Sequence, residues 1–348
     1  MDLVAPMAVA NAVRELSEPF VPFVSVARDG DGKAGATSGP ANRDWWQVRT
    51  TAQAGEQFPE HQRIDVAGRG EATVRMWLHP ARRDLVIDTG APGPLVLQYL
   101  VRYLRILLRL AHARGDEVFV HGGMVAENGR GVALIGAKRA GKTSTVMASM
   151  LAGRAFVAND DLSMARTGGG WTGRGWPRTV SVREDTFTAL GLPSGHGPHE
   201  GARGASRSVR RVPGRDGGQD TVLLRPQELA ELLDAPPPQP NAEVSVLLFP
   251  RFADSSADPT RLVPLAPPEA ARRLAANLLP VLVKDQRFLR PHFPPGPDPR
   301  ALGLAEQIAA VSPAYELVQH FSALREGALA VADLLSAPAE TTRFRSIR

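Results

Sequence analysis

One short stretch of the sequence has the residue types and spacing of a phosphate-binding loop. The run from Gly136 to Thr143 reads GAKRAGKT and matches the pattern G-x-x-x-x-G-K-[ST]. Glycines let successive backbone N–H groups turn inward, and with the start of a following helix they form a positive concavity for phosphate. Lys142 then reaches the β- and γ-phosphates, and the Thr143 hydroxyl is a ligand for Mg²⁺. The predicted nucleotide-binding residues are Gly136, Ala137, Lys138, Arg139, Ala140, Gly141, Lys142, Thr143 and Ser144, and the predicted cofactors are ATP and Mg²⁺.

Two carboxylates follow the loop after a short interval. Asp160 and Asp161 end the strand expected directly after the helix that the loop opens. A carboxylate beside the γ-phosphate can hold Mg²⁺ or accept a proton from an attacking hydroxyl. The sequence Asn-Asp-Asp would equally suit a turn or a helix cap after a strand. Because many phosphate-loop ATPases carry their metal-binding aspartate much further along the chain, the short spacing argues against an ABC-type or motor ATPase.

A histidine and several arginines are further candidates. His121 lies on the strand expected before the loop, and Gly122 and Gly123 after it permit a close approach of the backbone. Lone histidines beside strands are more often structural. Arginines from loops often stabilise the charge in phosphoryl transfer, so at least one is expected in the site. The candidates are Arg178, Arg183, Arg210, Arg211 and Arg251.

The elements around the loop alternate between strand and helix. Glu117–Val125 reads as one strand, Val132–Ile135 as a second and Arg154–Ala158 as a third. Apolar residues recur at helical spacing from Lys142 to about Leu151. This alternation predicts an α/β or α+β fold with a mixed sheet.

The rest of the chain supplies less distinctive elements. The first 90 residues predict short strands, and 95–113 predicts an amphipathic helix. Residues 194–219 are rich in Gly, Ser, Arg and His and predict a mobile loop. The other expected strands are 21–26, 46–51, 73–79, 84–88, 244–249 and 315–318, and the other expected helices are 183–190, 226–233, 269–279 and 327–335.

Composition narrows the classes of protein. The 348 residues contain no cysteine, which excludes disulfides, thiolate catalysis and cysteine zinc sites. The net charge of +5 is not accompanied by a nucleic-acid-binding pattern. The longest apolar stretch is interrupted by Arg102, Arg105 and Arg109, which predict a solvated stripe on a helix rather than a membrane span. Asp2 stands where a signal peptide needs basic residues, so a cytoplasmic protein is expected.

The stretch from Phe119 to Met164 resembles the kinase domain of HPr kinase/phosphorylase and its paralogues, a family that shares a fold with phosphoenolpyruvate carboxykinase. The resemblance depends on the order of four pieces. These are His121-Gly122, a short hairpin, Gly136–Ser144 and the strand Phe156–Asp161. Three later segments resemble the C-terminal half of that domain weakly: Val244–Leu265, Glu269–Leu279 and Pro313–Leu317.

The resemblance implies a carboxykinase-like mixed sheet and a role for each matched residue. Asp160 would be the catalytic base, His121 would lie beside the transferring phosphate, and Lys142 would hold that phosphate. Asp161 would hold the metal with Thr143, although the two aspartates could exchange roles. HPr kinases are homo-oligomers, and the sequence leaves the oligomeric state of this chain open.

The chain also departs from that family. Arg139 stands where the family usually has a glycine, and Lys138 stands where it has a small or acidic residue. The glycine-rich signature of the bifunctional enzymes is replaced by Trp176-Pro177-Arg178. Phosphorylase activity, and HPr as the substrate, are therefore not expected.

The sequence thus predicts a strand-rich region at 1–92, an ATP-dependent kinase domain at 93–335 and a tail at 336–348. The acceptor would be a hydroxyl of a peptide or protein serine, or of a small biosynthetic metabolite. A shikimate- or gluconate-kinase type would lack the histidine strand before the loop. A non-catalytic nucleotide-binding regulator would be expected to lose Lys142, Thr143 or Asp160. A carboxykinase-like enzyme would need further metal ligands.

Overall fold

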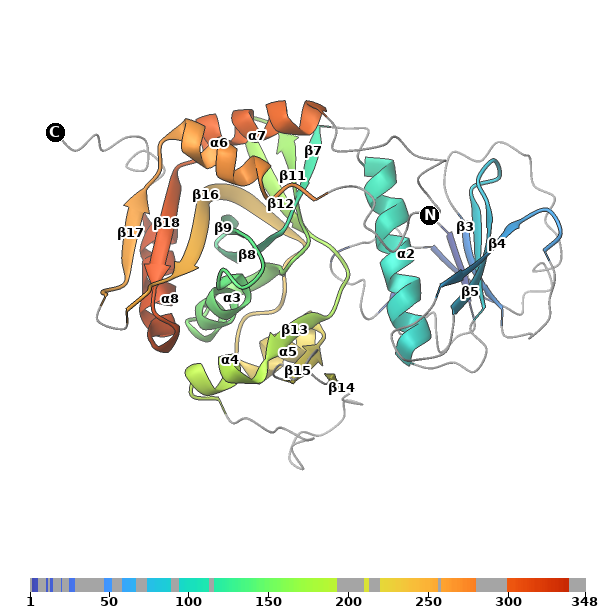
Figure 1. Ribbon diagram of the computed structural model, residues 1–348, viewed down its shortest axis with the longest axis horizontal. Coiled ribbons are helices and arrows are strands. Elements are labelled where there is room, and N and C mark those ends of the chain that lie inside the picture. Colours follow the sequence, from blue (N-terminus) through green and yellow to red (C-terminus); the bar gives the residue numbers. More distant parts are fainter. Residues whose placement is uncertain are drawn as a thin grey trace. The chain divides into compact units, whose positions relative to one another are not determined.

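The computed structural model describes residues 2–5, 11, 13–14, 20, 25–28, 47–51, 58–66, 74–88, 94–112, 116–192, 210–212, 220–255, 258–279 and 299–337. Within these ranges the chain forms two compact units, one reaching to His112 and one starting at Asp116 (Figure 1). The helix that ends at His112 belongs to the first unit. The boundary predicted from the sequence, between residues 92 and 93, would instead assign this helix to the second unit.

In its described residues the first unit holds a six-stranded mixed sheet, in agreement with the prediction of a strand-rich N-terminal region. Its strand order is β2-β1-β3-β6-β5-β4. The predicted hairpin is confirmed: β5 and β6 pair antiparallel around a turn closed by a hydrogen bond from Arg83 N to Pro80 O. The elements are β1 (Asp2–Ala5), β2 (Ser25–Arg28), β3 (Gln47–Thr51), β4 (Gln62–Val66), β5 (Val74–His79), β6 (Asp84–Asp88) and α2 (Pro94–His112).

The arginines of α2 do not form the predicted solvated stripe. Arg109 is buried and Arg102 and Arg105 are half-buried. Long arginine stems can cover apolar surface, so helical spacing alone does not decide exposure. In the described part of the chain, no helix combines the length and apolar character needed to cross a membrane.

The second unit is built on a nine-stranded mixed sheet, as far as the described residues show. Seven strands follow the order β10-β8-β9-β16-β12-β11-β7, and β18 pairs with β16 and β17. The sheet strands are β7 (Glu117–Val120), β8 (Gly122–Glu127), β9 (Arg130–Ile135), β10 (Ala155–Ala158), β11 (Leu162–Thr167), β12 (Gly170–Gly175), β16 (Asn241–Phe252), β17 (Arg261–Pro264) and β18 (Ala314–Gln319).

The single strand predicted at 117–125 is wrong: two strands meet at His121. β7 pairs with β11 at one edge of the sheet, whereas β8 lies between β9 and β10. The chain therefore changes its place in the sheet at His121, whose backbone N–H donates to Asn277 O at 2.8 Å. Local periodicity cannot reveal this break, because both segments are apolar and extended.

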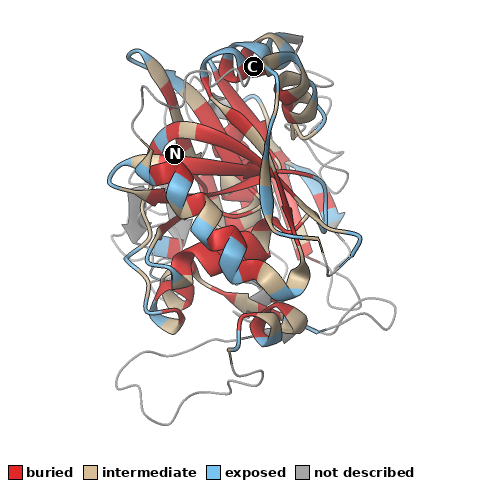
Figure 2. Ribbon diagram, turned by 90° about the vertical axis from the view of Figure 1, so that its left-hand side faces the viewer, coloured by how far each residue is buried: buried red, intermediate tan, exposed pale blue. Residues whose placement is uncertain are grey.

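Helices cover the sheet (Figures 1 and 2). One core cluster joins β-strand residues such as Ala133 and Ile135 to Leu274 of α6 and Ile308 of α7. Strand β9 is buried from Gly131 to Ile135, as expected for a strand covered on both faces. The helices are α3 (Lys142–Leu151), α4 (Glu184–Ala189), α5 (Pro226–Leu232), α6 (Pro267–Ala275), α7 (Pro299–Val311), the 3₁₀ turn η3 (Phe321–Ala323) and α8 (Leu324–Ser336).

A small third sheet has the order β13-β15-β14 and comprises β13 (Val180–Arg183), β15 (Thr221–Leu224) and β14 (Arg210–Val212). Strand β14 lies inside the segment predicted as a mobile loop. The remainder of 194–219 is outside the described residues, as is part of the predicted tail. Neither α7 nor β17 was predicted from the sequence as a separate element.

Candidate active site

The glycine loop joins the carboxyl end of β9 to the start of α3. Strand β9 is parallel to β16, and β16 is parallel to β18, so the ends of all three strands gather at one edge of the sheet. Such an edge is where open α/β sheets hold ligands. Gly141 caps α3 with φ 100°, and a Cβ there would lie 3.1 Å from the ring of Phe252 at the end of β16. Only glycine suits both the backbone angle and the space.

Lys142 is buried beneath this loop. Its Nζ donates to Gly136 O at 2.7 Å and to Ala137 O at 2.9 Å. Burial lowers the pKa of Lys142 to about 8, although the charge of Asp160 partly opposes the shift. The positive charge of Lys142 is therefore only partly balanced by Asp160 in the free protein, and an anion bound in the loop would balance it further.

The apex of the loop carries the two cations that the sequence singled out. Lys138 and Arg139 are both exposed. Arg139 has φ 70°, in the left-handed region that favours glycine, which costs an arginine about 1 kcal/mol. Arg139 thus has the backbone conformation of a glycine, the residue that the resembled family has at this position. Its exposed side chain can contact a ligand.

The turn between β10 and β11 brings Asp160 and Asp161 to the same edge. Asp160 has φ 66° and is half-buried, while Asp161 is buried. The carboxylate of Asp160 lies 3.4 Å from His121 Nε2. Burial alone would raise the pKa of Asp160, but His121, Arg178 and Lys142 outweigh it and lower the pKa to about 2. Asp160 is therefore ionised at neutral pH.

Arg178 bridges both aspartates. Its Nη1 donates to Asp161 Oδ2 at 2.6 Å, and its Nη2 lies 3.3 Å from Asp160 Oδ2. Burial by itself would lower the pKa of Arg178, but the two carboxylates raise it. Trp176, two residues earlier, fixes the turn by donating from Nε1 to Ser163 Oγ at 2.9 Å.

The other four candidate arginines do not join this cluster in the contacts that the structure shows. Arg183 pairs with Asp185 at 2.8 Å, and Arg251 pairs with Glu316 at 3.1 Å. Arg210 and Arg211 belong to β14. Of the five arginines named from the sequence, Arg178 is the one that these contacts bring to the two aspartates, and nothing in the sequence distinguished it from the other four.

Asn159 contacts a predicted site residue but was not itself predicted from the sequence. The Thr143 hydroxyl donates to Asn159 Oδ1 at 3.1 Å. The Nδ2 of Asn159 is buried and has no partner among the described residues. Its position directly before the two aspartates was the only available signal, and the acidic pair drew attention away from it.

The residues predicted to hold Mg²⁺ do not fit a protein-bound ion. Asp161 is engaged by Arg178, and the residue that meets Thr143 is the neutral amide Asn159. Over the ranges that the structure describes, no group of three acidic or histidine side chains is arranged to hold a metal. A metal would need carboxylate oxygens that an arginine already occupies.

His121 is positioned by backbone contacts. The two glycines after it have the close approach that the sequence suggested. A Cβ at Gly122 would lie 3.1 Å from Leu134 O, and one at Gly123 would lie 2.9 Å from Val146 Cγ2 in α3. Neither site has room for a side chain, so β8 can run directly beneath α3 and deliver His121 to Asp160.

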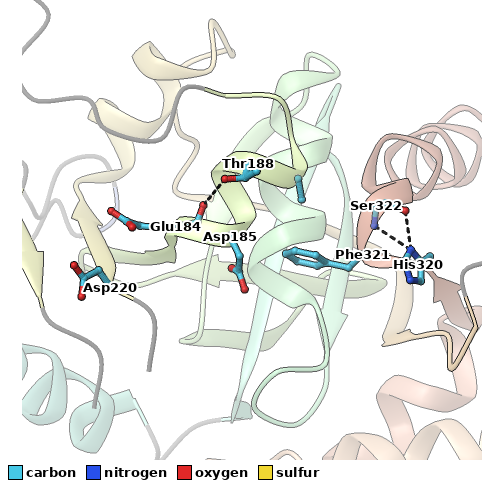
Figure 3. Close-up of a pocket in the computed structure, with 8 residues that line it drawn as sticks. Glu184, Asp185, Thr188, Asp220, His320, Phe321 and Ser322 are labelled. Carbon is cyan, nitrogen blue, oxygen red and sulfur yellow. Dashed lines mark hydrogen bonds between the residues drawn. The ribbon is translucent and has the colours of Figure 1, made fainter. Parts of the chain in front are cut away.

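A cavity of about 730 Å³ is lined mainly by residues of α4 and of the 3₁₀ turn η3 (Figure 3). It is connected to α3 by the contact between Ser144 Oγ and Thr186 Oγ1 of α4 at 3.3 Å. On the other side, Phe321 packs edge-on against Phe252 at 5.4 Å between ring centroids. The lining residues are Glu184, Asp185, Thr188, Ala189, Asp220, His320, Phe321 and Ser322.

Comparison with known proteins gives distant likenesses among solved structures. No protein-family model and no curated protein matches the chain. Among solved structures, the Hpr(Ser) kinase/phosphatase from Coxiella burnetii is similar over 62% of this chain and 93% of that chain, at 9% sequence identity and a TM-score of 0.28. At this TM-score the likeness carries no argument.

Proposed function

We propose that the chain is an ATP-dependent phosphotransferase that moves the γ-phosphoryl group to a hydroxyl. The observation that carries the proposal is that Lys142, beneath a glycine loop at the carboxyl end of β9, lies near Asp160, which Arg178 also contacts. Phosphoryl transfer needs positioning and charge compensation more than covalent chemistry, and these residues can provide both.

Each residue has a role in this proposal. The loop amides and Lys142 bind the phosphates, and Lys142 stays close to the charge that develops during transfer. Asp160 accepts a hydrogen bond from the acceptor hydroxyl and orients it. A carboxylate with a pKa near 2 is a weak base, so the proton leaves late, when the new P–O bond has already made the hydroxyl acidic. His121 contacts Oδ1 of Asp160, whereas Arg178 contacts Oδ2, so His121 helps to fix the orientation of this carboxylate.

The cavity at α4 and η3 suits the nucleoside of the donor. In a loop of this kind the lysine reaches the β- and γ-phosphates, and the α-phosphate lies towards the helix start and the nucleoside. Support comes from the contact of Ser144 with Thr186 of α4, because α4 carries four of the residues that line the cavity. Asp185 and Asp220 can accept hydrogen bonds from ribose hydroxyls, and Phe321 offers a ring for the base. Mg²⁺ would arrive with the phosphates rather than on Asp161.

The acceptor would be a serine of a peptide or protein, or a small metabolite with a hydroxyl. Its site must reach Asp160, which is 29% exposed at its side chain. A second candidate function is a nucleotide-binding regulator without transfer. It is favoured by the two ion pairs of Arg178, which occupy both carboxylates at once.

The test uses purified protein with γ-labelled ATP, Mg²⁺ and peptide or metabolite extracts. Asp160→Asn should abolish transfer and keep ATP binding, whereas Lys142→Ala should abolish both. The matched control is Asp116→Asn, because Asp116 is an exposed carboxylate that pairs with Arg300. ATP binding without label transfer in the wild type would favour the regulator. Absence of both, in a protein folded by circular dichroism, would exclude either function.

A further inference from the structure

Arg178 stands where an acidic pair would otherwise attract a divalent cation. Two adjacent carboxylates, one buried and one half-buried, face the same guanidinium. Like charges this close repel one another and need a compensating cation. In many nucleotide-binding sites a metal ion does this, whereas here the compensation comes from a side chain of the chain itself.

The guanidinium is fixed in this place by its surroundings. Pro177 and Trp176 precede it, both are buried, and the Trp176 indole is tied to Ser163 of β11. The Trp176 ring also packs against Phe119 of β7, at 5.6 Å between ring centroids. Arg178 therefore extends from a rigid turn, which reduces the entropy that a flexible arginine would lose on pairing.

We propose that Arg178 replaces a protein-held divalent cation at Asp160 and Asp161, so that the chain binds no metal there while this arginine is present. The net charge around Asp160 and Asp161 explains why Arg178 would oppose metal binding. With Arg178 in place the two negative charges share one positive partner and the nearby Lys142 and His121. Without it, the two carboxylates would lose the guanidinium that they share, and their oxygens suit Mg²⁺ or Mn²⁺. The inference concerns the cation alone and does not depend on phosphoryl transfer.

The experiment is a titration with Mn²⁺ alone, without nucleotide, in which electron paramagnetic resonance counts the free ion. Four proteins are compared with the wild type: Arg178→Gln, Arg178→Lys, Asp161→Asn, and the double variant with Arg178→Gln and Asp161→Asn. Arg300→Gln is the matched control, because it removes one arginine charge from a single exposed aspartate. Circular dichroism establishes that each variant is folded.

The expected result is that Arg178→Gln gains one Mn²⁺ site that the wild type lacks, at least about tenfold tighter than the weakest binding that the titration detects, and that the double variant loses it. Arg178→Lys and Arg300→Gln should behave as the wild type does. If Arg178→Gln does not fold, the wild type and Asp161→Asn still decide, since equal Mn²⁺ binding by these two is expected. Weaker binding by Asp161→Asn than by the wild type would overturn the proposal, as would a folded Arg178→Gln that gains no site.

Discussion

Burial disfavours the positive charge of Lys142, and the resulting shift in its pKa can be measured. Its pKa falls from 10.5 to about 8 in the folded chain. At about 1.4 kcal/mol per pKa unit, the folded state disfavours the protonated form by about 3 kcal/mol relative to the unfolded chain. Because the folded pKa is the lower one, the unfolded chain binds more protons between pH 8 and 10.5. The free energy of unfolding must therefore rise with pH across that window.

Replacement by methionine removes the titrating group and keeps the volume. The free energy of unfolding of the wild type minus that of Lys142→Met should increase by about 2–3 kcal/mol between pH 7 and pH 10. At pH 7 the methionine variant avoids the burial of a charge but leaves Gly136 O and Ala137 O without their donor. The two effects oppose each other, so the pH dependence is the informative quantity.

The direct assay is nuclear magnetic resonance with labelled lysine. The sequence has only four lysines, Lys33, Lys138, Lys142 and Lys284, so substitution of each assigns every signal. The Lys142 signal should titrate near pH 8 in the free protein and at higher pH with pyrophosphate bound, because an anion favours the ammonium. A Lys142 signal that titrates only above pH 10, or a stability difference that is flat with pH, would refute the reasoning.

Three other substitutions test the supports of the site, each by urea unfolding. Asp160→Asn should lower the free energy of unfolding by about 1–2 kcal/mol at neutral pH, and its difference from the wild type should fade as the pH drops from 4 towards 2, because the folded pKa of about 2 lies below the usual 3.8. Gly123→Ala should cost about 1–3 kcal/mol, since its Cβ would meet a valine methyl of α3, whereas Gly169→Ala has open space and should change little. Gln319→Leu should cost about 1–3 kcal/mol, because the buried Gln319 donates to Thr145 Oγ1 at 2.7 Å, and an unchanged midpoint would contradict that contact.

Local patterns in the sequence were sufficient to predict the elements on either side of the glycine loop. The apolar run before Gly136 and the helical spacing after Lys142 predicted the strand, loop and helix that the structure shows, although β9 starts two residues earlier than expected. The hairpin of β5 and β6 was equally readable, because alternation and a polar turn lie within a few residues of each other. The role of the loop in nucleotide binding stays a prediction.

What the sequence could not determine depends on contacts between distant segments. The break at His121 arises because β7 and β8 pair with different partners, and pairing partners leave no mark on an apolar run. Which arginine joins the aspartates depends on the turn after β12, fixed by a tryptophan that binds β11. The residue types thus established a phosphate-loop pattern with two acidic neighbours. Only the tertiary structure decided that an arginine lies on both carboxylates and an asparagine on Thr143, because a charge acts through distance in space and not through position in the chain.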